Sequence, residues 1–232
     1  MTPETRKKIA ENNLRISELL KENENLLREE GYLPPMHNFA LPPNERIAFP
    51  SGYIRTVQNF NEKYHLREIF PNKASRHNVT YALEVSDLLN FILNRIHIWG
   101  AVKTIFYKLA IVNLVSIIEA IVLETANNIC ANAAYCRKTS SCKKHFNKNE
   151  RSNARLALQK MVYLDVLDFD TEKLSRVQNI IDLRNRIHIR LAHGSEMQLD
   201  DFNLSLYNEV VCLLQDIDRQ LYEKGVPLYR CP

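Results

Sequence analysis

Apolar residues recur along most of this chain at intervals of three and four positions, the spacing that gathers side chains on one face of an α-helix. Alternation of apolar and polar positions, which would indicate β-strands, is scarce. We expect helices over about residues 3–30, 79–99, 101–128, 151–163, 170–194 and 200–224. The pattern predicts an all-α protein whose later helices form an antiparallel four- to five-helix bundle.

Composition divides the chain into three segments. Residues 1–30 are expected to form an N-terminal helical arm that starts at Pro3, directly after Thr2. Residues 31–77 contain several prolines and little helical periodicity, so we expect an extended Pro-rich connector with a short strand at 53–57. Residues 78–225 are expected to form the helical bundle.

The N-terminal arm permits two interpretations. Apolar and Asn side chains follow the a and d positions of heptads, at Ile9, Asn12, Ile16, Leu19, Asn23 and Leu26. The Asn residues weaken a coiled coil, but they can fix its register and the number of its strands. The other interpretation, which the amphipathic pattern alone favours, is an arm packed against its own domain.

Composition and charge narrow the class of protein. Hydrophobic residues make up 45% of the 232 residues, enough for a core, and the net charge of +4 does not by itself indicate a nucleic-acid-binding protein. The most apolar run, residues 109–123, contains Asn113, Ser116 and Glu119, which is typical of a buried bundle helix rather than a membrane span. No secretory signal is visible, and the five cysteines are an odd number, so we expect a cytoplasmic protein with free thiols.

The most informative stretch of the chain is residues 182–194, which carries three arginines and two histidines near the end of an expected helix. At helical spacing Arg184 falls within the apolar stripe, and His188 lies on its flank one turn later. The stripe itself consists of Val177, Ile180, Ile187 and Leu191. An arginine on such a stripe needs a partner or a function, because burying an unpaired charge is costly.

The order of these features resembles the HEPN superfamily of helical nucleotide-binding and ribonuclease domains. Ser116-Ile117-Ile118-Glu119 lies on the central apolar helix, and Arg184-Asn185, with the later Leu191-Ala192-His193-Gly194, lies on a following helix. In that superfamily the motif is an arginine, often followed by asparagine, with a histidine after four to six intervening residues. The resemblance would cover the bundle and leaves residues 1–77 unexplained.

The resemblance assigns candidate catalytic residues. Arg184, Asn185 and His188, with Glu119, form the preferred set, although only three residues separate Arg184 from His188. The second choice is Arg186 with His193, which have six residues between them but lack the asparagine. Helical spacing places these two pairs on nearly opposite faces. The structural alternative is that Arg184 pairs with Glu119 inside the bundle and has no catalytic role.

The residue types suit RNA cleavage without a metal ion. Histidine titrates near neutral pH and can act as a general base or acid, while arginine holds phosphate oxygens with its planar guanidinium group. The resemblance implies a metal-independent endoribonuclease of a prokaryotic defence or toxin–antitoxin system, without a cofactor. It also implies a homodimeric site, with an antitoxin or another defence protein as a further partner. The competing function is a non-catalytic helical module that dimerises and binds RNA or protein.

Positive charge is concentrated in residues 137–160. This stretch contains eight basic residues and one acidic residue, a net charge of +7, whereas the whole chain carries +4. Such a concentration is typical of a contact with the RNA backbone, and a solvated loop is the alternative. We expect the RNA contacts to be Lys143, Lys144, Lys148, Arg151 and Arg155.

Cysteine and histidine lie close together in the same region, at Cys130, Cys136, Cys142 and His145. The set contains the residue types of a Cys₃His zinc site but lacks the two-residue spacing of strong zinc signatures. We therefore favour unpaired thiols and expect no metal site.

One pentapeptide occurs twice, as Asn94-Arg95-Ile96-His97-Ile98 and as Asn185-Arg186-Ile187-His188-Ile189. The flanking residues differ between the copies, so we interpret the identity as coincidence rather than as an internal repeat.

Overall fold

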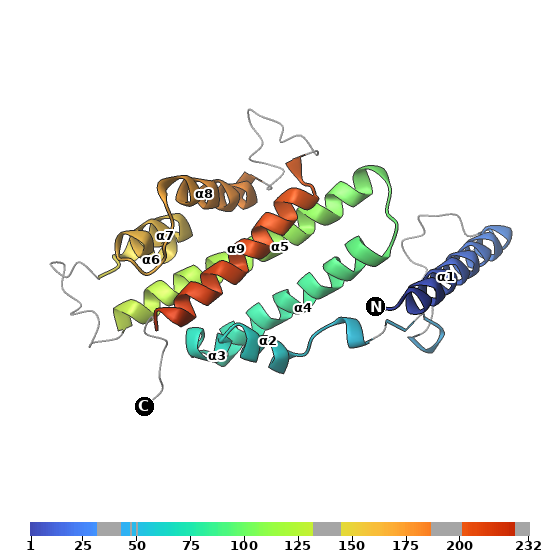
Figure 1. The fold of residues 1–232 in the computed structure, drawn as a ribbon, viewed down its shortest axis with the longest axis horizontal. Coiled ribbons are helices and arrows are strands. Elements are labelled where there is room, and N and C mark those ends of the chain that lie inside the picture. Colours follow the sequence, from blue (N-terminus) through green and yellow to red (C-terminus); the bar gives the residue numbers. More distant parts are fainter. Residues whose placement is uncertain (32–42, 47, 50, 132–144, 187–200, 226–232) are drawn as a thin grey trace. The chain divides into compact units, whose positions relative to one another are not determined.

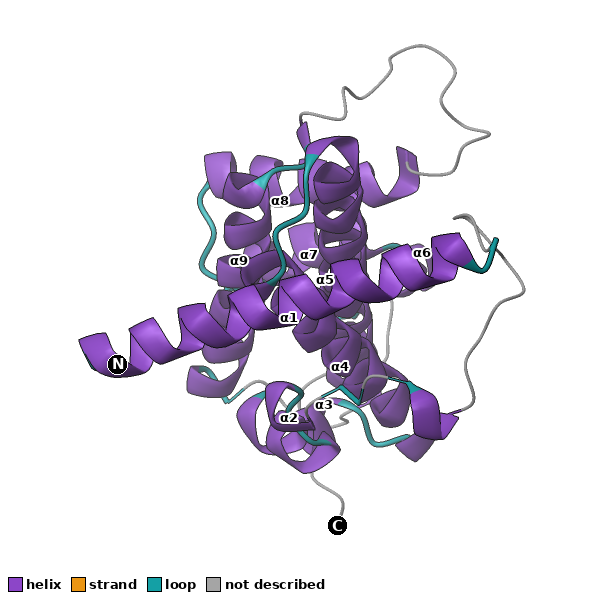
Figure 2. Cartoon of the chain, turned by 90° about the vertical axis from the view of Figure 1, so that its right-hand side faces the viewer, coloured by secondary structure: helices purple, strands orange, loops and turns teal. Residues whose placement is uncertain are grey.

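The fold was obtained as a computed structural model, which describes residues 1–31, 43–46, 48–49, 51–131, 145–186 and 201–225. For residues 43, 51 and 183–186 the description covers the backbone alone. Every regular element within these ranges is a helix, as the colouring of Figure 2 shows, so the predicted all-α class is confirmed. The chain divides into two units, residues 1–49 and residues 50–232.

The main element of the first unit is helix α1 (Pro3–Glu29). The Thr2 hydroxyl accepts a hydrogen bond from the Thr5 amide at 3.2 Å, and Pro3 occupies the first turn, where its missing N–H has no intrahelical partner to lose. The chain leaves the helix through Gly31 at φ +84°, a left-handed conformation that glycine adopts without strain. The predicted N-terminal helix is therefore confirmed.

Among its described residues the second unit contains a short 3₁₀ helix, Ser51–Tyr53, and eight α-helices. They are α2 (Val57–Lys63), α3 (Leu66–Ile69), α4 (Lys73–Arg95), α5 (Gly100–Ala131), α6 (Lys148–Ser152), α7 (Ala154–Tyr163), α8 (Thr171–Arg186) and α9 (Leu204–Glu223). Asparagine caps several of them, because its short side chain can accept hydrogen bonds from the first free amides. Asn72, for example, accepts from the Ala74 amide at 2.8 Å, so α4 begins six residues before the start predicted from apolar periodicity.

The strand predicted at residues 53–57 is wrong, and so is the extended conformation predicted for the segment that follows it. Thr56 begins α2 with a capping box, in which its hydroxyl accepts from the Asn59 amide and the Asn59 side chain accepts from the Thr56 amide. Short helices form here because their aromatic and aliphatic side chains enter the core. The fully buried side chains of this segment include Phe60, Leu66 and Ile69.

Helix α5 is the centre of the second unit. It contacts α3, α4, α6, α7, α8 and α9, and its buried side chains extend from Tyr107 to Cys130. Among the described residues it is the one helix long and apolar enough to cross a membrane by length and composition. Contact with other helices on several sides accounts for its apolar sequence, as expected of a core helix.

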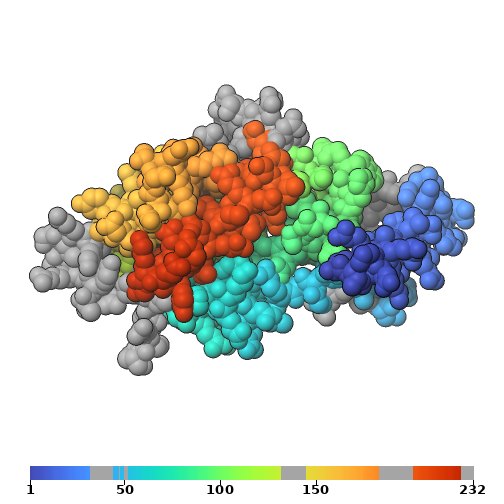
Figure 3. All heavy atoms as spheres, viewed as in Figure 1, coloured from blue at the N-terminus to red at the C-terminus, as the bar shows by residue number. Residues whose placement is uncertain are grey.

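The long helices lie along one another (Figure 1). Helices α4 and α5 form a hairpin and run in opposite directions, while α9 lies along α5 and runs in the same direction. Helix α8 packs on α5 and α7. Figure 3 shows α9 at the surface, with the α6–α8 segment on one side and the α2–α4 segment on the other. The surface between α8 and α9 contains a groove.

Candidate functional site

Helix α8 carries the start of the predicted Arg–His motif. The Asp170 carboxylate accepts a hydrogen bond from the Lys173 amide at 2.7 Å and satisfies a free donor in the first turn. Val177, Ile180 and Ile181 are at most 3% exposed, so this side of the helix is anchored in the core. The backbone of Arg184, Asn185 and Arg186, the described part of the motif, thus lies on a well-packed helix.

Arg184 and Asn185 lie in the last described turn of α8. Arg184 follows Val177 by seven positions and Ile180 by four, so its backbone lies on the face of the helix that meets the core. Arg186 follows Asp182 by four positions and starts from a different face. The two candidate motifs therefore begin on different sides of one helix, as the sequence predicted. His188 and His193, which would complete them, lie outside the described residues.

Glu119 lies on α5, the helix against which α8 packs, and is 9% exposed. The prediction of an acidic residue embedded in the central helix is confirmed. Burial of a carboxylate requires hydrogen bonds or a cation nearby. Direct contact between Glu119 and Arg184 remains a prediction.

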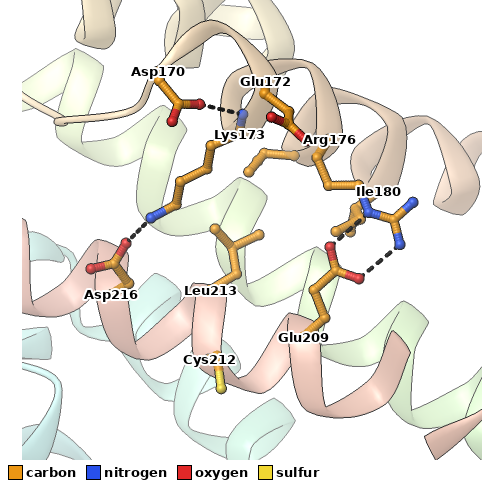
Figure 4. A pocket seen from close by; sticks show the side chains of 10 residues that line it. Asp170, Glu172, Lys173, Arg176, Ile180, Glu209, Cys212, Leu213 and Asp216 are labelled. Carbon is orange, nitrogen blue, oxygen red and sulfur yellow. Dashed lines mark hydrogen bonds and ion pairs between the residues drawn. The ribbon is translucent and has the colours of Figure 1, made fainter. Parts of the chain in front are cut away.

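A groove of about 520 Å³ runs between α8 and α9. Its floor is apolar and includes Val177, Ile180 and Leu213. Two ion pairs cross it, as Figure 4 shows: the Arg176 guanidinium group donates to both oxygens of Glu209 at 2.7 Å, and the Lys173 ammonium group donates to Asp216 at 2.5 Å. Cys212, an exposed free cysteine, lies on α9 between Glu209 and Asp216.

Hydrogen bonds shift the pKa values of three groove residues, Arg176, Glu209 and Asp216, in the direction that favours their charged forms. The Arg176 hydrogen bonds lower the pKa of Glu209, and the same interaction raises the pKa of Arg176. Burial acts to raise the pKa of Asp216, but hydrogen bonds from Lys173, Gln220 and Arg219 outweigh it, so that pKa lies below its usual value. Local sequence patterns do not reveal this groove, because pairs such as Arg176 and Glu209 are far apart in the chain.

The structure divides the predicted RNA contacts into two groups. Lys148 and Arg151 are exposed on α6. Arg155 lies on α7 and donates to the Asp182 carboxylate of α8 at 2.8 Å, so its charge is already partly neutralised. Lys160, in the same basic stretch, pairs with Glu150 at 2.9 Å. Lys143 and Lys144 lie outside the described residues.

Two of the four residues considered for zinc come together. The Cys130 sulfur is buried, accepts a hydrogen bond from the Phe146 amide at 3.0 Å and lies 4.0 Å from His145 Nδ1. Cys136 and Cys142 lie outside the described residues. Within the described part of the chain, no group of three or more possible metal ligands occurs.

The first copy of the repeated pentapeptide lies at the end of α4. The helix ends at Arg95, and the remaining residues form a loop beside a second hollow of about 340 Å³, which is also lined by Lys103. In the second copy α8 is described through Arg186, which is equivalent to Arg95. The first copy therefore provides a histidine, His97, in the same five-residue sequence but in the loop that follows α4.

An acidic side chain on α9 was also missed. Burial raises the pKa of Asp218 to about 6, an effect that the nearby charges of His65 and Lys63 oppose. Asp218 Oδ1 has no hydrogen-bond partner in the described structure. His65 stands between α2 and α3 at φ 47° and stacks on the Tyr222 ring, with 4.1 Å between centroids. Asp218, His65 and Tyr222 come together only where α9 packs near the turn between α2 and α3. No local sequence pattern could therefore reveal this cluster.

Comparisons with known protein families, with curated proteins and with solved structures find no match to this chain.

Proposed function

We propose that this protein is a metal-independent endoribonuclease of the HEPN type that acts as a homodimer. The observation that carries the proposal is the backbone position of Arg184, one turn beyond the buried Ile180 on the core-facing side of α8. That side meets α5, which carries the buried Glu119. A guanidinium group anchored on such a face requires a carboxylate or a bound anion, and a phosphate of RNA is an anion of the right geometry.

The proposed chemistry needs two proton-transfer groups. His188 would take the proton from a ribose 2′-hydroxyl, whose oxygen attacks phosphorus as the bond to the 5′-oxygen breaks. Arg184 would stabilise the charge that builds on the phosphate, and Asn185 would orient the histidine or bind a phosphate oxygen. The departing 5′-oxygen needs a proton, which His188 of a second copy would supply, so a homodimeric site follows from the proposal.

The basic stretch would bind the RNA backbone. Lys148 and Arg151 are exposed on α6, next to α7 in sequence, and α7 packs on α8. We include Lys143, Lys144 and Arg155 in this proposed surface. The proposed setting is the prokaryotic cytoplasm, within a defence or toxin–antitoxin system, with an antitoxin as a further partner.

The arrangement of the helices in a bundle is part of the same proposal. The central helix α5, its hairpin partner α4 and the packed helices α7, α8 and α9 would form the four- to five-helix bundle. The opposite directions of α4 and α5 support an antiparallel arrangement, whereas the shared direction of α5 and α9 departs from a simple up-and-down bundle.

A second function is a non-catalytic helical module that dimerises and binds RNA or protein. The specific observation in its favour is α1, a helix of 27 residues of which none is buried. In this alternative Glu119 would only neutralise Arg184 within the core.

The test is RNA cleavage by the purified full chain in the presence of EDTA. We expect cleavage of single-stranded RNA and a loss of about 10²–10⁴-fold in His188→Ala, the range for a general base or acid. His97→Ala is the matched control, because His97 lies in the same pentapeptide, and it should retain activity.

The remaining outcomes separate the alternatives. Loss of activity in His193→Ala but not in His188→Ala would assign the site to Arg186 and His193. Full activity in Arg184→Ala would exclude the preferred site. Absence of cleavage by the wild-type protein, together with tight RNA binding, would favour the non-catalytic module.

A further inference from the structure

Helix α1 exposes a continuous apolar stripe. The side chains of Ile16, Leu19 and Leu26 are 51–54% exposed, and those of Leu20 and Leu27 are 48% and 37% exposed. A helix of this length is about 40 Å long, and an unpartnered apolar stripe along it is typical of a surface that binds another helix. Leu14 lies on the opposite face and is not part of the stripe.

The heptad pattern gives the stripe a defined geometry. Ile9, Ile16 and Asn23 occupy a positions, and Asn12, Leu19 and Leu26 occupy d positions. In an antiparallel pair of identical helices each a residue meets a d residue of the partner. With the twofold axis between residues 17 and 18, Ile9 meets the partner's Leu26 and Ile16 meets the partner's Leu19.

The polar positions select this register. In it Asn12 meets the partner's Asn23, so each amide finds another amide instead of a leucine. Shifting one helix by a heptad would place an asparagine against an aliphatic side chain or beyond the end of the partner. A buried Asn pair of this kind fixes the register of a coiled coil.

Charge independently selects the same orientation and register. The g positions that flank the stripe are Lys8, Arg15, Glu22 and Glu29. In the antiparallel register Lys8 faces the partner's Glu29, and Arg15 faces the partner's Glu22. In a parallel pair these residues would instead face e positions, which hold Arg6, Asn13, Leu20 and Leu27 and offer no opposite charge.

The distribution of charge along the whole helix agrees with this orientation. Residues 1–15 carry a net side-chain charge of +2, and residues 16–30 carry −3. Antiparallel helices place each basic half beside an acidic half, whereas parallel helices place like charges together.

We infer that α1 pairs with α1 of a second copy of this chain in an antiparallel coiled coil with its twofold axis between Ser17 and Glu18. The inference bears on the proposed ribonuclease only because both require a second copy. It identifies the surface that joins the copies, and it applies equally to a non-catalytic protein.

The test is a charge-reversal experiment on the full chain, with mass measured by light scattering at micromolar concentration. Lys8→Glu with Arg15→Glu makes every g position acidic, and Glu22→Lys with Glu29→Lys makes every g position basic. Each double variant alone should dimerise at least tenfold more weakly than the wild type. An equimolar mixture of the two should form a heterodimer, because all the g–g pairs are then of opposite charge.

Lys7→Glu with Lys21→Glu is the matched control, since it makes the same change in net charge at f positions on the outer face. It should dimerise like the wild type. A monomeric wild type, an unchanged dimer in both g-position variants, or a mixture that fails to pair would each overturn the inference. Cleavage of RNA is scored separately, so a dimer without ribonuclease activity would overturn the proposed function and leave this inference standing.

Discussion

Arg155 and Asp182 form an ion pair between α7 and α8, with 2.8 Å between Nη1 and Oδ2. The pair joins a residue predicted to bind RNA to the helix that carries the predicted catalytic arginine. Half of the Arg155 side chain is exposed, so the pair stabilises the fold only slightly. Its main consequence is that Arg155 is less available to a phosphate than Lys148 or Arg151.

RNA binding should reflect this difference. Replacing Lys148 and Arg151 by Ala should weaken binding and reduce the slope of log affinity against log salt by about 0.7 for each lost phosphate contact with single-stranded RNA. Arg155→Ala should change the slope less. RNA-binding titrations measure these slopes, at salt concentrations from about 50 to about 200 mM. Equal slopes in all variants would mean that the basic stretch is solvated surface.

The stability of the fold should depend on pH through Asp218. Burial raises its pKa to about 6 from an ordinary value near 4, so between these values the folded protein holds a proton that the unfolded chain has lost. The free energy of unfolding should therefore fall as the pH rises from about 4 to 6 and then level off. Because Asp218 is partly exposed, the expected loss is on the order of 1 kcal/mol.

Asp218→Asn should remove this dependence. The variant should be more stable than the wild type at pH 7–8, on the order of 1 kcal/mol, and nearly equal to it at pH 4. Urea unfolding at several pH values measures the difference, with Asp165→Asn as an exposed control. If the wild-type protein instead became more stable relative to Asp218→Asn between pH 4 and 6, the raised pKa of Asp218 would be wrong.

The ion pair of Arg55 and Asp87 should contribute measurably to stability. The Arg55 guanidinium group donates to both oxygens of Asp87, at 2.9 and 2.6 Å, and the Arg55 amide donates to Asp87 as well, at 2.9 Å. Asp87 is only 8% exposed. Arg55→Ala leaves that carboxylate without its cation and should cost about 1–3 kcal/mol, less than for a fully buried pair.

A matched double variant distinguishes the net contribution of the ion pair from the cost of leaving Asp87 buried without its cation. Arg55→Met with Asp87→Leu removes both charges and should recover most of the stability lost in Arg55→Ala. Urea unfolding with circular dichroism provides the free energies. A double variant as unstable as the single one would show that packing around Phe60, whose ring lies 4.6 Å from the Arg55 guanidinium carbon, is the larger contribution.

Removing the asparagines from the stripe of α1 should strengthen its self-association. Asn12→Leu with Asn23→Leu replaces the polar layers by apolar ones, so we expect dimers that survive at least tenfold greater dilution. The variant should also lose its unique register, which cysteine cross-linking between copies can detect. Weaker association would contradict the placement of these residues in the interface.

Local patterns predicted the long elements and missed what depends on distant partners. Helix α5 was predictable because its apolar run is long and contains the embedded Glu119. Helix α2 was missed because its stability comes from the burial of Phe60 and from the Arg55–Asp87 pair, whose members are 32 positions apart. The six prolines among residues 31–77 favour an extended chain, and they carry no information about those contacts.

The same limit applies to the site. Helical spacing placed Arg184 on the inner face of α8 and Arg186 on another, because that relationship is local. The groove between α8 and α9 needed the pairing of Arg176 with Glu209, which only the tertiary fold provides.

Helix α1 is joined to the second unit by the chain between Glu29 and Pro50. Even fully extended, these residues span no more than about 75 Å. Two copies held together by α1 would therefore keep their second units at a high effective concentration, of the order of millimolar. At that concentration the two second units would contact each other even if their mutual affinity were too weak for free units to associate. The geometry of the contact could then change without separating the two copies.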